Sequence, residues 1–113
     1  MKKIGFILSL LLPISVMSSP QAEIEHLLEF VRMTPCFYER NGVLHTGPKA
    51  FEHIQKKADY YADDIQAAED FIEYSATKSM LSKQRYQVHC EGRPVVYSSD
   101  WLLSELQRYR TIN

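Results

Sequence analysis

The stretch TPCFYERNGVLHTG, residues 34–47, predicts the start of a small antiparallel sheet. Asn41 and Gly42 stand between two short β-prone runs, and both tolerate the positive φ angles that a two-residue hairpin turn requires. Residue 40 should then face residue 43, and residue 38 should face residue 45. One face of the hairpin would carry Cys36, Tyr38, Arg40, Val43 and His45, and the other Phe37, Glu39, Leu44 and Thr46.

The N-terminus has the layout of a secretory signal peptide. Two lysines precede an apolar run over residues 4–16, and small serines follow it. The run of about 13 residues is too short to span a bilayer comfortably. We expect residues 1–18 to be a signal peptide cleaved near Ser18, which leaves residues 19–113 as a single periplasmic domain without a membrane contact. The alternative is a buried N-terminal helix.

The charge of the expected mature domain bears on its partners. Cleavage removes two of 13 Lys and Arg and none of the 14 Asp and Glu, so the formal charge falls from −1 to −3. This balance argues against a nucleic-acid partner, which normally needs a basic stripe. A mildly acidic domain instead suits a basic protein partner.

The chain has only two cysteines, Cys36 and Cys90. An exported chain with two cysteines most simply pairs them. The loop of about 55 residues that they close would be worth roughly 4 kcal/mol in the chain-entropy model. A metal pair or a catalytic thiol is the alternative, but a metal site would want more Cys and His at short spacing, such as C-x-x-C. We therefore expect a disulfide, no metal and no cofactor.

Residues 19–33 predict an amphipathic helix. Ser19 can cap it, Pro20 occupies the first position, where its missing N–H costs nothing, and Pro35 ends it. The apolar residues Ile24, Leu27, Leu28 and Val31 form one stripe. A second apolar pattern, at spacings of three and four, extends over residues 47–76.

The sequence leaves open whether residues 47–76 form one helix or two. One helix of nearly 30 residues is long for a small domain. We therefore expect a break near residues 62–66, with Asp63 or Asp64 capping the second helix.

The C-terminal part adds strands and a last helix. Residues 85–90 alternate between polar and apolar and predict a strand, and residues 95–97 predict a shorter one. Ser98 or Ser99 would cap a final helix. Its inward residues would be Trp101, Leu102, Leu106 and Tyr109. The whole order predicts an α+β domain, in which a small antiparallel sheet (the hairpin plus one or two late strands) packs with about four helices.

Two pairs of polar residues are candidates for chemistry. Arg40 and Asn41 at the hairpin tip could bind an anion, or be a turn residue beside a solvated arginine. His53 and Lys57 are four residues apart, so they share one face of a helix. They could form a proton-transfer set, or simply face water. The sequence has no G-x-S-x-G, no H-E-x-x-H and no phosphate-binding loop motif.

The stretches EIEHLLEFV, CFYERNG, AFEHIQKKADY, AEDFIEYSATKSMLSKQRYQVHC and WLLSELQRYR resemble the YfeK-like family of small exported bacterial proteins of unknown function. The resemblance covers nearly all of the expected mature chain. The family usually has Ser-Gly or Thr-Gly where this chain has Ser82-Lys83. The resemblance implies a Gram-negative periplasm and implies no reaction.

Seven polar residues occur in the parts that most resemble the family: Arg40, Asn41, His53, Lys57, Ser79, Ser82 and Tyr86. They would meet where the hairpin packs against the second helix and the serine-containing loop. One interpretation is a polar binding surface. The other is a buried hydrogen-bond network that fixes the hairpin.

Two functions follow from this sequence. The first is a non-enzymatic accessory protein that docks an envelope protein, a toxin or a lytic enzyme. The second is a small periplasmic ligand-binding protein or enzyme that uses a polar site around His53 and Lys57. A flat aromatic patch facing solvent would favour docking, and a concave pocket with a shifted histidine pKa would favour the ligand site.

Overall fold

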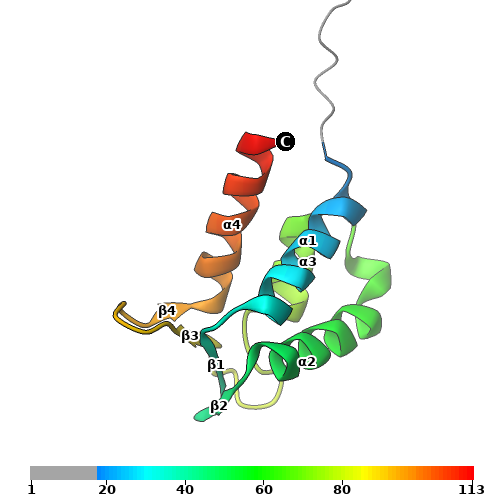
Figure 1. Ribbon diagram of the computed structural model, residues 1–113. Coiled ribbons are helices and arrows are strands. Elements are labelled where there is room, and N and C mark those ends of the chain that lie inside the picture. Colours follow the sequence, from blue (N-terminus) through cyan, green and yellow to red (C-terminus); the bar gives the residue numbers. More distant parts are fainter. Residues whose placement is uncertain (1–17) are drawn as a thin grey trace, which may run out of the picture.

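The computed structural model describes residues 18–113, which form an α+β fold (Figure 1). Within that part of the chain, the elements are α1 (Pro20–Met33), β1 (Phe37–Arg40), β2 (Val43–His45), α2 (Gly47–Tyr60), the 3-10 helix η1 (Ala62–Asp64), α3 (Ala68–Ser75), β3 (Gln87–His89), β4 (Val96–Tyr97) and α4 (Ser98–Ile112). The predicted fold class is therefore confirmed. The expected signal peptide lies outside the described residues except for its last one. None of the described helices is long and apolar enough to cross a membrane.

The four described strands form one antiparallel sheet in the order β2-β1-β3-β4. The hairpin has the predicted register, with Tyr38 opposite His45 and Arg40 opposite Val43. Asn41 and Gly42 both have positive φ, 51° and 78°, as the turn requires. The sequence pattern of the opening stretch therefore predicted this hairpin correctly.

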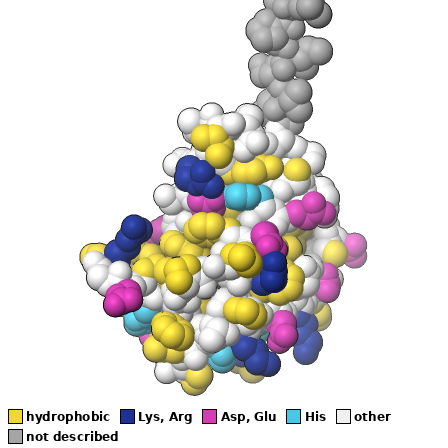
Figure 2. Space-filling view, in the orientation of Figure 1, with side chains coloured by type: hydrophobic (Ala, Val, Ile, Leu, Met, Phe, Trp, Pro, Cys, Tyr) yellow, Lys and Arg dark blue, Asp and Glu magenta, His cyan; other side chains and the backbone are white. Residues whose placement is uncertain are grey.

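The sheet buries one of its faces. Tyr38 and Val88 are paired across β1 and β3 and are buried against the helices. Phe37 and Leu44 point the other way and are about half exposed, at 49% and 51%. Figure 1 shows the helices gathered on one side of the strands, and Figure 2 shows apolar side chains among charged ones over the part of the surface where the strands lie.

Helix α1 begins as predicted. The Ser19 hydroxyl accepts a hydrogen bond from the Ala22 backbone N–H at 3.1 Å, and Pro20 occupies the first position. The helix ends at Met33, two residues before Pro35. Leu27, Leu28 and Val31 from the predicted stripe are buried, and Ile24 packs at its edge.

Residues 47–76 form the two expected helices, α2 and α3, but the predicted cap of the second helix is wrong. Asp63 and Asp64 belong to η1 and do not begin α3. The Asp70 carboxylate instead accepts hydrogen bonds from the backbone N–H groups of Gln66 and Ala67, at 3.1 and 3.0 Å. An acidic residue in the first turn of a helix can reach back to N–H groups before it, so α3 does not need an aspartate at its cap.

The late strands are shorter than predicted. Strand β3 covers Gln87–His89 where residues 85–90 were expected, and β4 covers Val96–Tyr97 where residues 95–97 were expected. The predicted serine cap of α4 is also wrong. The Ser98 hydroxyl donates to the Tyr38 hydroxyl at 2.9 Å, in the core, and the Ser99 hydroxyl accepts from Arg85 at 3.3 Å. Both side chains have partners outside the helix, and therefore leave its first N–H groups uncapped.

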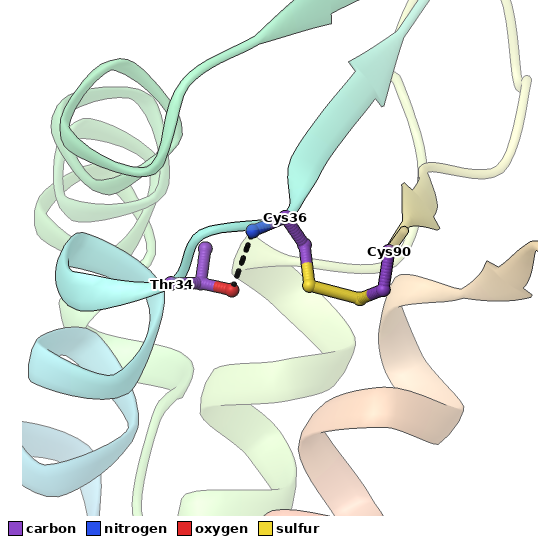
Figure 3. Close-up of a disulfide and its surroundings, with 3 residues drawn as sticks. All are labelled: Thr34, Cys36 and Cys90. Atoms are coloured by element: carbon purple, nitrogen blue, oxygen red, sulfur yellow. Dashed lines mark hydrogen bonds between the residues drawn. A yellow bond between two sulfur atoms is a disulfide. The ribbon is translucent and has the colours of Figure 1, made fainter. Parts of the chain in front are cut away.

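The predicted disulfide joins Cys36 and Cys90, with the two Cα atoms 4.5 Å apart (Figure 3). It ties the start of β1 to the residue that follows β3. The Cys36 N–H donates to the Thr34 hydroxyl at 3.1 Å, which orders the link from α1 into the hairpin. The buried apolar residues are Leu27, Leu28, Val31, Tyr38, Ala50, Ile54, Ala68, Phe71, Ile72, Ala76, Tyr86, Val88, Leu102 and Leu106.

Candidate functional site

A groove of about 490 Å³ lies between the hairpin tip, helix α2 and the loop that leads to β3. We call it the basic groove. Its lining residues are Arg40, Asn41, His53, Lys56, Lys57, Tyr60, Tyr61, Ser79, Met80, Leu81 and Tyr86. Six of the seven polar candidates line it. The seventh, Ser82, lies beside it, since its hydroxyl donates to Asn41 Oδ1 at 2.6 Å.

Helix α2 supplies one wall of the basic groove. His53, Lys56, Lys57 and Tyr60 are spaced by three and four residues, so they lie along one face of the helix. The adjoining side of α2 holds the helix in place, because Ala50 and Ile54 are buried in the core. The position of the groove therefore depends on the amphipathic pattern of α2.

Tyr86 forms the floor of the basic groove. The residue is only 2% exposed, and its ring packs against that of Tyr38 with the centroids 5.6 Å apart. Its hydroxyl lies 3.2 Å from His53 Nε2 and accepts a hydrogen bond from Lys57 Nζ at 3.1 Å. Its backbone is also held on both sides, by the carbonyl of Thr77 and the N–H of Ser98.

The loop over the groove is attached to the hairpin tip. Besides the contact with Asn41, the Ser82 N–H donates to the Ser79 hydroxyl at 3.3 Å. Lys83 closes the loop by donating its N–H to the Ser79 carbonyl, with a φ of +64°. A tight turn therefore forms at Ser82-Lys83 although the chain has no glycine there.

The charge of the basic groove is positive. Arg40, Lys56 and Lys57 line it, and no carboxylate does. None of the three forms an ion pair with another residue in the range 18–113. Lys57 donates instead to neutral oxygens, the Lys78 carbonyl at 2.8 Å and the Tyr86 hydroxyl. The groove is thus a cationic site on a chain whose net charge is negative.

Burial and these cations change the titration of the groove residues. Burial, followed by the positive charges of Arg40 and Lys57, lowers the pKa of His53 to about 4. Burial, followed by the charge of Arg40, also lowers the pKa of Lys57. Burial raises the pKa of the Tyr86 hydroxyl, against the opposing charge of Arg40. At neutral pH, His53 is therefore an uncharged imidazole and Tyr86 an uncharged phenol.

The exposed rim of the groove is apolar. Leu81 is 96% exposed, Tyr60 80% and Met80 55%. The ring of Tyr61 packs between those of Tyr60 and Tyr74, and its hydroxyl donates to the Met80 sulfur at 2.6 Å. An anion in this groove would lie close to both the lining cations and these apolar side chains. The described residues contain no cluster of three or more His, Cys, Asp and Glu that could hold a metal ion.

A model of a protein family, described as a family of unknown function (DUF5329), matches residues 18–110. The chain belongs to the DUF5329 family. The match confirms membership of a family without an assigned function, and it bears on neither export nor reaction. No curated protein and no solved structure matches the chain.

The DUF5329 match spans every residue of the basic groove. Sequence reasoning missed five of them: Lys56, Tyr60, Tyr61, Met80 and Leu81. Lys56 and Tyr60 follow His53 at positions three and seven, so helical spacing could have identified them. Met80 and Leu81 stand in a loop without periodicity, and only the folded chain brings them to the groove.

Proposed function

We propose that this protein is a periplasmic ligand-binding protein whose basic groove binds a small anion that carries an apolar or aromatic group. The observation that supports this most directly is the convergence of Arg40, Lys56 and Lys57 on a concave site without any lining carboxylate. The predicted signal peptide and the disulfide support the periplasmic location.

The recognition of the anion is assigned to Arg40 first. A guanidinium presents several N–H donors in a planar fork that matches a carboxylate. Arg40 has no acidic partner among the described residues, so these donors are free for a ligand. Lys56 is exposed at the groove and adds a second charge.

The recognition of the apolar group is assigned to the rim. Tyr60, Met80 and Leu81 are exposed around the groove, and a ligand that covers them would remove apolar surface from water. Exposed apolar groups beside a few convergent polar groups are typical of small-molecule sites.

This proposal follows the second of the two functions that the sequence suggests. The groove is concave and holds a histidine with a lowered pKa, which are the features expected of a ligand site. A basic protein partner would need a negatively charged surface, whereas the groove is positively charged. Binding without catalysis remains the simpler proposal, because it requires only the charges and surfaces that line the groove.

The test is a titration of the purified, isotope-labelled protein with 2-naphthoate, followed by NMR. The backbone amide signals that shift should belong to the hairpin tip, α2 and the loop around Met80. Arg40→Gln should weaken binding by about 10-fold or more, because a hydrogen bond to a charged group is worth roughly 1.5–3 kcal/mol.

The neutral isostere 2-naphthamide and the variant Lys49→Gln are the controls. Lys49 lies on α2 outside the groove, where it pairs with Glu52, so its loss makes the same charge change without touching the site. Lys49→Gln should leave binding nearly unchanged. Equal binding of 2-naphthamide, or shifts at the other end of the molecule, would rule the proposal out.

A further inference from the structure

Lys57 is placed differently from the other lysine of the groove. It is half-buried, whereas Lys56 is exposed. Its Nζ donates to the Lys78 carbonyl and the Tyr86 hydroxyl and lies 5.0 Å from the centroid of the Tyr86 ring. These two bonds use two of the three N–H donors of an ammonium group. The nitrogen lines the groove, so a ligand there can reach it.

The surroundings of Lys57 lower the pKa of its amine, so a larger share of it is uncharged than in an exposed lysine. Its Nζ has no carboxylate partner among residues 18–113, and the burial and the Arg40 charge that lower its pKa both act against the ammonium form. Desolvation or a neighbouring cation makes a lysine amine more reactive as a nucleophile, because only the uncharged form attacks.

A proton donor and acceptor lies beside this amine. The Tyr86 hydroxyl is bonded to Lys57 Nζ on one side and is 3.2 Å from His53 Nε2 on the other. With Lys57 donating to its oxygen, the hydroxyl can donate to an uncharged His53. Tyr86 can therefore give a proton to, or take one from, a group that binds next to Lys57.

We propose that Lys57 forms a reversible imine with the carbonyl group of the anionic ligand, an inference that rests on the proposed function. The ligand class is then an aldehyde or ketone that also carries a carboxylate or similar anion. Arg40 would hold the anionic group, and the apolar rim would hold the carbon skeleton.

The reaction is a condensation that needs no oxidant or reductant. The Lys57 nitrogen bonds to the carbonyl carbon, the π pair of the C=O bond moves to oxygen, and Tyr86 protonates that oxygen while the nitrogen returns a proton to Tyr86. The C–O bond of this carbinolamine then breaks. Tyr86 protonates the departing hydroxyl, which leaves as water, the nitrogen pair forms the C=N bond, and the iminium proton returns to Tyr86. One amine and one carbonyl thus give one imine and one water.

The test is reductive trapping with 4-formylbenzoate and cyanoborohydride, with the modified residue located by peptide mass spectrometry. Lys57 should be labelled at least about 10-fold faster than Lys56, its exposed neighbour. Lys57→Arg keeps the positive charge and should abolish the fast labelling. The neutral isostere 4-formylbenzamide should label Lys57 more slowly, because it lacks the anion.

Tyr86→Phe separates the chemical role of the hydroxyl from the bulk of the ring. It should slow labelling of Lys57, provided that its melting temperature shows a folded protein. His53→Gln keeps a hydrogen-bonding group near Tyr86. This variant tests the same proton transfer by the Tyr86 hydroxyl, with less disturbance of the core. Trapping rates at Lys57 that equal those at Lys56 or Lys49 would overturn the inference.

The outcome also distinguishes this inference from the proposed function. If 4-formylbenzoate without reductant shifts the amide signals of the groove but trapping gives no adduct at Lys57, the imine is wrong and anion binding stands. If the compound neither shifts the groove signals nor labels Lys57, both proposals are wrong. A rapid adduct in the wild type that disappears in Lys57→Arg would support the imine.

Discussion

Tyr86 shows how one residue can belong to the core and to a site. Its ring is buried against Tyr38, and its hydroxyl reaches the groove between His53 and Lys57. Tyrosine suits this position because its body is apolar and its end is polar. The sequence allows two interpretations of the polar candidates, as a buried hydrogen-bond network or as a binding surface, and each interpretation describes part of the structure. Tyr86 and Ser79 are buried, whereas Arg40 and Lys57 line an open groove.

The charge state of His53 predicts a dependence of stability on pH. Folding lowers its pKa from the ordinary 6.5 to about 4, so in between the unfolded chain binds more protons than the folded one. The contribution of His53 is constant above about pH 6.5 and is lost as the pH falls toward 4. The groups that face it, Arg40, Lys57, His45 and Lys56, are cationic or become so, and none stabilises a protonated His53.

The measurement compares the melting temperatures of the wild type and His53→Gln between about pH 7 and pH 4. The wild type should lose more stability than the variant over this range, and the His53 ring signals should titrate near pH 4 in NMR. Parallel losses in the two proteins, or a ring titration near 6.5, would contradict the expectation.

Lys83 offers a prediction at a single backbone position. Its φ of +64° is unfavourable for a side chain with a Cβ, and the residue is exposed. Lys83→Gly should therefore stabilise the protein by roughly 0.5–1 kcal/mol, after allowing for the greater freedom of glycine in the unfolded chain. Urea unfolding gives the free energy. Lys83→Ala is the matched control, since it removes the same charge but keeps the Cβ, and it should give no gain.

At the scale of elements, the contact between α1 and α2 depends on Gly47. A Cβ at Gly47 would lie 2.6 Å from the Val31 carbonyl oxygen and 2.9 Å from that of Arg32. These are backbone atoms at the end of α1, so they cannot rotate out of the way. The absence of a side chain at Gly47 therefore lets the first turn of α2 approach the last turn of α1.

Gly47→Ala should destabilise the protein by roughly 1–3 kcal/mol, as overpacking of a tight contact does. The comparison is Thr46→Ala at the preceding position. Thr46 is exposed and makes no capping hydrogen bond through its side chain, so its loss should cost little. Thermal melting of both variants checks the prediction, and equal effects would show that the close approach is not the cause.

At the scale of the whole molecule, an ion-pair cluster and a disulfide link segments that are far apart in the sequence. Arg110 near the end of α4 forms ion pairs with Glu23 of α1 at 2.7 Å and with Glu69 of α3 at 2.8 Å. The disulfide joins two residues separated by 54 positions. Since neither link involves a groove residue, their loss should affect stability before it affects ligand binding.

The double variant Cys36→Ser with Cys90→Ser should lower the free energy of unfolding by about 2–5 kcal/mol. The reason is that the unfolded chain gains the freedom that the cross-link removes. Urea unfolding of the oxidised wild type, the reduced wild type and the variant gives the comparison. The reduced wild type should match the variant. A variant as stable as the oxidised protein would show that the cross-link contributes little to this small domain.

The sequence by itself determined the features that depend on residues close together along the chain. The Asn-Gly pair specified the hairpin and its register, Ser19 and Pro20 specified the start of α1, and apolar spacing specified the buried sides of the helices. The disulfide could also be predicted, because the sequence has only two cysteines and each can pair only with the other. Each of these features depends on a few neighbouring residues, or on the lack of any alternative partner. They can therefore be predicted without knowledge of the fold.

Only the tertiary structure decided which hydrogen-bond partners the polar side chains have, because some of these partners come from distant segments. Ser98 could have capped α4, but the buried hydroxyl of Tyr38 offers it a partner in the core, and Asp70 caps α3 from within. The groove likewise forms only where α2, the hairpin tip and the loop that holds Ser79, Met80 and Leu81 meet around Tyr86. The choice of a hydrogen-bond partner depends on burial and distance in the folded chain, and neither has a local signature in the sequence.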